Sequence, residues 1–103
     1  MSPPDDWQNP INAVPGQTQQ DVDPARLRPG RTDLVRSRLE YQRKLIKSGQ
    51  ARFTPIQVSQ EGVIIDGHHY VRAAAEERRM IEVLVTSLSA VALADSIFNV
   101  PLR

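Results

Sequence analysis

Short apolar stretches bounded by turn residues predict the strands of this chain. They lie at residues 19–22, 53–59, 63–66 and 81–86, and Glu61-Gly62 supplies a tight turn between the second and third stretches. The β-branched content of the last stretch is typical of a strand. The pattern therefore predicts four strands, two of which form a hairpin.

A helical pattern occupies residues 32–48, because apolar residues there recur at the spacing of one helix face. Thr32 or Asp33 can cap its start, and Gly49 can end it. The basic residues are expected to point away from the apolar face, which is broad enough to cover a sheet and includes Leu39, Tyr41 and Ile46.

Three further segments have helical signals. Asp23 and Pro24 favour a single helical turn before Pro29-Gly30, since aspartate caps helices and proline suits the first helical position. Residues 68–80 are rich in alanine, which favours helix. Residues 89–98 predict a short closing helix with a serine cap.

The order strand, helix, strand, strand, helix, strand, helix predicts a small α/β or α+β domain, in which helices pack on a mixed sheet. Residues 19–103 form this single domain. Residues 1–18 are proline-rich and lack an apolar period, so we expect a flexible N-terminal arm. Trp7 is expected to pack on the domain or on a partner chain, and homodimerisation is a related candidate.

Composition limits the class of protein. The chain has 103 residues and no cysteine, which excludes disulfides, thiolate metal sites and cysteine nucleophiles. No apolar stretch approaches the roughly 20 residues of a membrane span, so a cytoplasmic protein without membrane contact is expected. The net charge is +1, but residues 26–52 hold nine basic and two acidic residues, and this segment could face phosphates.

The candidate chemistry lies where the predicted strand 63–66 meets the predicted helix 68–80. The first N–H groups of a helix attract anions, and glycine lets a ligand approach the backbone. Asp66 is a candidate Mg²⁺ ligand or proton acceptor there. His68 and His69 are the two histidines of the chain, and they are candidate phosphate-binding groups or candidate acids and bases near neutral pH. The alternative is structural: Asp66 caps the helix, and the histidines are buried or exposed without a chemical role.

The stretch "TPIQVSQEGVIIDGHHYVRAAAEERRMIEVLV", with the lead-in "VDPARLRPG", resembles the ParB/sulfiredoxin superfamily over about residues 20–86. The likeness is to ParB-like nuclease-type domains with an Asp-Gly-His-His junction and to the free-serine-kinase branch. Sulfiredoxin itself is excluded, because its catalytic cysteine would fall at His68. The resemblance implies a sulfiredoxin-like fold and a phosphate site at Gly67, His68 and His69.

One position departs from the family, because Tyr70 stands where an arginine usually binds phosphate. Candidate substitutes are Arg26, Arg28, Arg31 and Arg52. Arg72 is a further candidate phosphate-binding residue, although it is expected to point to another side of the helix. Glu40 is a candidate general base. The resemblance also implies a nucleoside triphosphate as ligand or substrate, with Mg²⁺ as a candidate cofactor.

Three functions remain open from the sequence. The first is a nuclease or nucleotide hydrolase, of toxin type among others, with Asp66, His68, His69 and Glu40 in catalytic roles. The second is a module that binds nucleotide or DNA without turnover, or a phosphotransferase similar to free serine kinase. The third is an interaction domain whose N-terminal arm docks to another protein.

Overall fold

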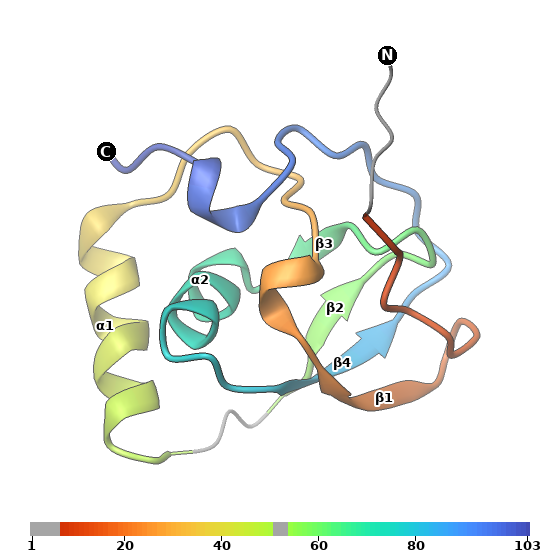
Figure 1. The fold of residues 1–103 in the computed structure, drawn as a ribbon, viewed down its shortest axis with the longest axis horizontal. Helices are drawn as coiled ribbons and strands as arrows, with labels where there is room; N and C mark the ends of the chain where they lie inside the picture. Colours follow the sequence, from red (N-terminus) through yellow and green to blue (C-terminus); the bar gives the residue numbers. More distant parts are fainter. Residues whose placement is uncertain (1–6, 51–53) are drawn as a thin grey trace.

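The computed structural model describes residues 7–50 and 54–103 and is a small α+β domain. The helices and strands follow the predicted order closely (Figure 1). They are β1 (Thr18–Val22), the 3-10 helix η1 (Pro24–Arg26), α1 (Arg36–Lys47), β2 (Ile56–Val58), β3 (Ile64–Asp66), α2 (His68–Glu76), β4 (Ile81–Val85) and the 3-10 helix η2 (Ile97–Asn99).

The four strands form one mixed sheet in the order β1-β4-β2-β3. β1 is antiparallel to β4, β2 is parallel to β4, and β2 and β3 form the predicted antiparallel hairpin. The turn of that hairpin passes through Glu61-Gly62, where the N–H of Gly62 donates to the carbonyl of Ser59 at 3.1 Å. Because α2 follows β3 after a single residue, its N-terminus begins at the outer strand of the sheet.

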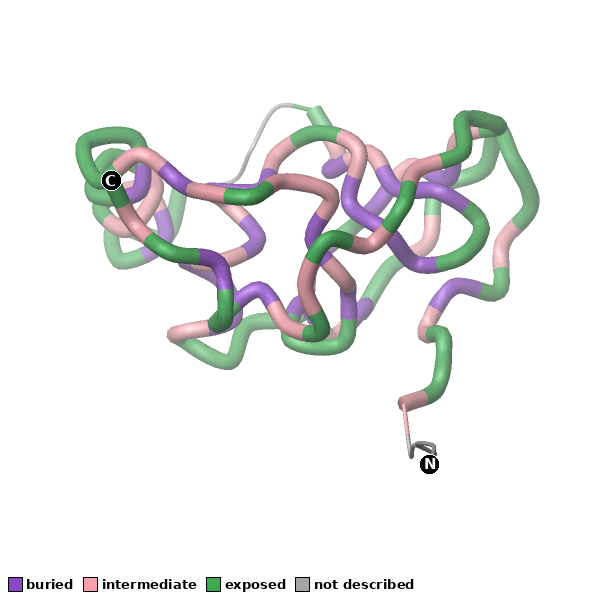
Figure 2. Tube along the Cα trace, turned by 90° about the horizontal axis from the view of Figure 1, so that it is seen from above, coloured by how far each residue is buried: buried purple, intermediate pink, exposed green. Residues whose placement is uncertain are grey.

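One apolar cluster holds these layers together. It joins alternate residues of the strands to the alanine-rich face of α2, and α1 packs on α2. The buried segments lie toward the middle of the molecule, and the outer turns are exposed (Figure 2). Leu39 and Ile46 of α1 are buried as predicted, whereas Tyr41 is 62% exposed and does not belong to the apolar face.

The start of α1 differs from the prediction. The helix begins at Arg36 with Val35 as a cap that offers no side-chain hydrogen bond, so neither Thr32 nor Asp33 caps it. The reason is long-range pairing: the N–H of Leu34 donates to the carbonyl of Pro101 at 2.9 Å, and the N–H of Arg103 donates to the carbonyl of Leu34 at 2.8 Å. Residues 101–103 thus pair with the backbone of Leu34 and keep it extended just before the start of α1.

The closing helix predicted over residues 89–98 is also wrong. The chain there is irregular until Ser96, which caps the 3-10 helix η2. The N–H of Leu93 donates to the carbonyl of Pro29 at 2.9 Å. In a helix, the same N–H would donate to a carbonyl of the preceding turn instead. A tertiary contact has overridden the helix propensity of the alanines here.

The described part of the predicted flexible arm, residues 7–18, packs against the domain, and its last residue belongs to β1. Ile11 belongs to the core, and the indole N–H of Trp7 donates to the carbonyl of Arg26 at 2.7 Å. The guanidinium of Arg28 lies 3.9 Å from the centre of the Trp7 ring. The apolar surface of Trp7 and Ile11 therefore rests on the domain itself. No helix among the described residues is long and apolar enough to cross a membrane.

Candidate functional site

The site begins at Gly67, which connects β3 to α2. Its φ of 99° lies in the left-handed region, and a Cβ at this position would collide with Cδ1 of Ile56. Only glycine fits such a position without strain. As the N-cap of α2, Gly67 makes no side-chain hydrogen bond to the first-turn N–H groups, so the cap residue itself does not neutralise the positive end of the helix.

The two histidines that follow Gly67 are buried and bind the backbone of another segment. Nε2 of His68 accepts from the N–H of Gly30 at 2.9 Å, and Nε2 of His69 accepts from the N–H of Val35 at 3.0 Å. An Nε2 that accepts carries no proton, which assigns the proton of each neutral ring to Nδ1. Both histidines therefore fasten the loop from Gly30 to Val35 to the start of α2.

The electrostatics agree with neutral rings. Burial lowers the pKa of His68 to about 4, and the positive charge of Arg31 acts in the same direction. Burial also lowers the pKa of His69, again with a contribution from Arg31. Both imidazoles are consequently uncharged at neutral pH. The sequence had suggested instead that they exchange protons near this pH.

A cavity of about 260 Å³ opens at this junction, and we call it the junction cavity. Four segments supply its walls: the loop after η1, one side of α1, the end of β3 and the start of α2. Its lining residues with polar or charged groups are Arg31, Arg38, Gln42, Asp66, His68, His69 and Tyr70, together with the backbone of Gly30 and Gly67.

The charge of the junction cavity is predominantly positive. Arg31 and Arg38 contribute guanidinium groups, and Asp66 is the carboxylate on the lining. Arg31 also lies 3.6 Å from Asp33, but this partly exposed pair is long. Arginine forks and helix N–H groups are the protein groups best suited to phosphate oxygens, so the cavity is suited to an anion.

Two predicted site residues lie elsewhere. Arg72 donates to Glu76 at 2.9 Å and to the carbonyl of Ile97 at 3.4 Å, which turns it away from the junction cavity. Glu40 is exposed on α1 and pairs with Arg43 at 2.7 Å, outside the cavity lining. Arg52 lies outside the described residues.

Sequence reasoning missed Arg38 and Gln42. The basic residues of α1 were expected to point away from the fold, but Arg38 lines the junction cavity. Gln42 follows four residues later on the same side of the helix, and its Oε1 is buried without a partner among the described residues. The available signal in the sequence was the four-residue spacing of Arg38 and Gln42, which places both on one side of α1 next to the buried residues Leu39 and Ile46.

Comparisons with known proteins bear on the fold alone. No protein-family model and no curated protein matches the sequence. Among solved structures, the chain is similar to protein Atu1540 from Agrobacterium tumefaciens, with a TM-score of 0.64 and 14% identity over 84% of this chain. The similar region is 62% of that protein, so this chain spans less than two thirds of its length. A likeness at this identity supports the α+β fold.

Proposed function

We propose that this domain binds the phosphate groups of a nucleotide or of a nucleic-acid strand in the junction cavity. The observation that carries the proposal is the convergence of Arg31 and Arg38 on a helix start whose N-cap is a left-handed glycine. The helix dipole and the two guanidinium groups favour the same sign of ligand charge. The resemblance to ParB-like domains, in which phosphates bind at this junction, points to the same ligand.

Binding is better supported than histidine-based catalysis. A general acid or base needs a free ring nitrogen and a pKa near the working pH. In His68 and His69, Nε2 already accepts a backbone N–H, and burial lowers the pKa of each ring. We therefore assign the histidines a positioning role, in which they hold the loop that carries Arg31.

Asp66 supports a second, catalytic version of the proposal. It is the carboxylate on the junction cavity, and no group of three potential metal ligands occurs among the described residues. Mg²⁺ is commonly bound by one or two protein carboxylates together with the phosphates of the substrate. Asp66 is suited to be the protein ligand of such an ion. Phosphoester hydrolysis or phosphoryl transfer would then depend on Asp66.

Binding can be tested by calorimetric titration with nucleoside phosphates and with short single- and double-stranded DNA. Replacing Arg38 by Gln should weaken binding about tenfold or more, because a charge-assisted contact is lost. Arg36→Gln is the matched control: Arg36 is exposed on the same helix, does not line the cavity, and its loss changes net charge equally. Equal losses in both variants would indicate general charge attraction and contradict the proposed site.

The catalytic version requires a separate measurement. The protein is incubated with the tightest ligand and Mg²⁺ or Mn²⁺, and products are separated by chromatography. Turnover that is lost in Asp66→Asn but retained in Arg36→Gln would support catalysis. Binding without any product would leave a nucleotide- or DNA-binding module. For DNA, the affinity should fall steeply with salt, because phosphate contacts release counterions.

A further inference from the structure

Another cavity lies at the end of α2, whereas the junction cavity lies at its start, and we call it the helix-end cavity. Its volume is about 650 Å³, within the range of about 300–1,000 Å³ that is usual for sites of small organic ligands. Within the described part of the chain, the two cavities share no lining residue. The walls of the helix-end cavity include Asp23, Ala75, Glu76, Arg78, Met80 and Phe98.

Apolar side chains form much of the helix-end cavity. Ala25 and Ala75 line it with short side chains, which leave space between η1 and α2. Met80 is 54% exposed and Phe98 is 46% exposed, although side chains of these types are usually buried. A ligand with an apolar side chain would cover surface that the fold leaves in contact with water, and this burial favours binding.

The charged groups of the helix-end cavity have both signs. Glu76 is already paired with two arginines. Asp23 and Arg78 form no ion pair with each other or with any other residue that the structure describes. One oxygen of Asp23 accepts from the N–H of Ala25 at 3.0 Å, and the second oxygen is left as an acceptor. A ligand with an ammonium and a carboxylate group would therefore satisfy both unpaired charges.

The backbone of Arg78 gives separate support. Its φ of 56° lies in the left-handed region directly after the C-cap of α2, where glycine is the usual residue. Arginine at this position carries backbone strain that glycine would avoid. Strained residues of this kind concentrate at functional sites, so a ligand explains the guanidinium of Arg78 better than the stability of the helix end does.

We infer that the helix-end cavity binds a zwitterion with an apolar side chain, either a free amino acid or a dipeptide. The ammonium group pairs with Asp23, the carboxylate pairs with Arg78, and the apolar side chain lies against Met80 and Phe98. This site is separate from the phosphate site and does not depend on it.

Calorimetric titration with leucine, methionine and phenylalanine, and with dipeptides of the same three amino acids, tests the inference and distinguishes the two sources. At least one of these ligands should bind. Glycine is a zwitterion without an apolar side chain, and it should bind about tenfold or more weakly than the best of them.

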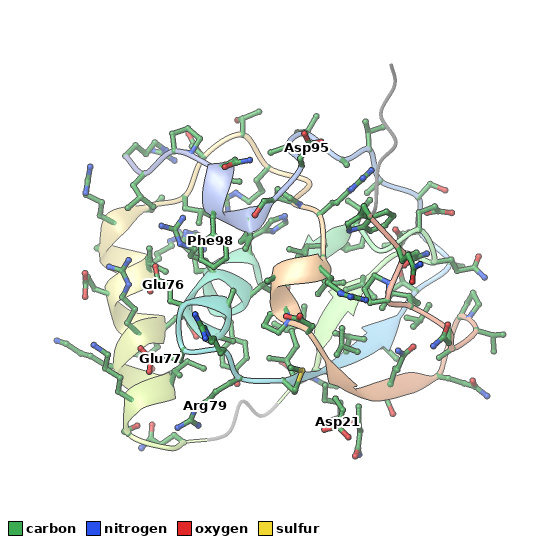
Figure 3. The ribbon with its side chains drawn as sticks, in the orientation of Figure 1. Asp21, Glu76, Glu77, Arg79, Asp95 and Phe98 are labelled. Carbon is green, nitrogen blue, oxygen red and sulfur yellow. The ribbon has the colours of Figure 1, made fainter. Side chains whose placement is uncertain are left out.

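Two substitutions test the charged contacts. Asp23→Asn and Arg78→Gln should each weaken binding about tenfold or more, because each removes one charge-assisted contact. Asparagine caps a helix as well as aspartate does, so Asp23→Asn should remain folded. Asp21→Asn and Arg79→Gln are the matched controls. Both residues are exposed and do not line the cavity, and Figure 3 shows them near the outer edge of the domain.

Blocked ligands assign each contact to its partner. The N-acetyl form of the best ligand lacks the ammonium group, and its amide lacks the carboxylate. Each form should bind the unmodified protein about tenfold or more weakly than the parent ligand. Acetylation should cost little further affinity in Asp23→Asn, and amidation should cost little further in Arg78→Gln, because the partner group is already absent.

Arg78→Gly separates binding from stability. Glycine relieves the left-handed strain, so this variant should melt at or above the temperature of the unmodified protein and still lose binding. The inference is wrong if none of the apolar zwitterions binds the unmodified protein, or if glycine binds as tightly as the best of them. It is also wrong if the two control variants lose as much affinity as Asp23→Asn and Arg78→Gln. Phosphate binding at the junction cavity stands in each of these cases.

Discussion

Nε2 of His68 accepts a hydrogen bond of 2.9 Å from the backbone N–H of Gly30, a residue that lies 38 positions earlier in the chain. His69 makes the equivalent bond with Val35. Adjacent histidines on one helix turn thus fix the two ends of one loop. The side chain of Arg31, within that loop, lines the junction cavity.

Substitution of His68 should affect stability before it affects any chemistry. His68→Ala removes the acceptor of the Gly30 N–H in a buried position, which should lower the free energy of unfolding by about 1–3 kcal/mol. His68→Gln can place an oxygen near the Nε2 position, and we expect it to recover part of the loss. Urea denaturation monitored by circular dichroism measures both. Equal stability of His68→Ala and the unmodified protein would contradict the positioning role.

Stability should also depend on pH in the acidic range. The pKa of His68 is lowered from 6.5 to about 4 by burial, so the unfolded chain takes up a proton before the folded one does. The contribution of neutral His68 to the free energy of unfolding is therefore fully present above pH 6.5. It declines as the pH falls toward 4, by up to about 1.4 kcal/mol per pH unit. His69 should add to the decline, because burial lowers its pKa too.

Denaturation curves recorded at intervals between pH 8 and pH 4 would measure this decline. His68→Gln cannot titrate in this range and should make the decline shallower, leaving the part that His69 contributes. A free energy of unfolding that stays constant from pH 7 to pH 5 would show that the histidines ionise normally in the fold.

Gly67 should not tolerate a side chain. Gly67→Ala combines a φ of 99° with a collision against Ile56, and we expect a loss of about 2 kcal/mol or more. Gly16→Ala is a matched control, because Gly16 has a φ of 92° but nothing within 4 Å of its added Cβ. The difference between the two variants in thermal melts measures the cost of the collision. Equal losses would mean that backbone strain alone accounts for both.

Glu76 connects the two helices and should stabilise their packing. It accepts from Nη2 of Arg43 on α1 at 2.7 Å and from Nε of Arg72 at 2.9 Å, and it lies between α1 and α2 in Figure 3. Glu76→Gln should lower the free energy of unfolding by about 1–3 kcal/mol, since charge-assisted bonds are weakened. Glu77→Gln is the control, because Glu77 is adjacent and exposed (Figure 3). Similar losses in the two variants would contradict the bridging role.

This contribution has a defined pH range. Hydrogen bonds from Arg43 hold the pKa of Glu76 below its ordinary value of 4.5. Its stabilisation is therefore present above pH 4.5 and is lost as the pH falls further. The difference between Glu76→Gln and the unmodified protein should shrink below that pH, which denaturation curves at pH 3 and pH 7 can show.

The parts of the fold that depend on local signals could be predicted from the sequence. The hairpin turn at Glu61-Gly62 and the single turn capped by Asp23 are confirmed, because glycine and aspartate determine the backbone there directly. The start of α1 could not be predicted, since Leu34 pairs with residues near position 102. Neither could the irregular course around Leu93, whose N–H bonds to Pro29.

The site shows the same division. Gly67, His68 and His69 are consecutive, so the sequence alone brings them together. Arg38 reaches the cavity through the packing of α1 on α2, which no local pattern specifies. The buried acceptor role of the histidines could not be predicted either, because their partners lie 34 and 38 positions away.

The pairing of Leu34 with residues 101–103 has a consequence for the order of folding during synthesis. A ribosome releases the hairpin, α2 and β4 before it releases the segment that pairs with Leu34. The sheet can therefore form before residues 101–103 are available to pair with Leu34. The wall of the cavity that carries Arg31 should be the last part of the domain to become rigid, once residues 101–103 can pair with Leu34.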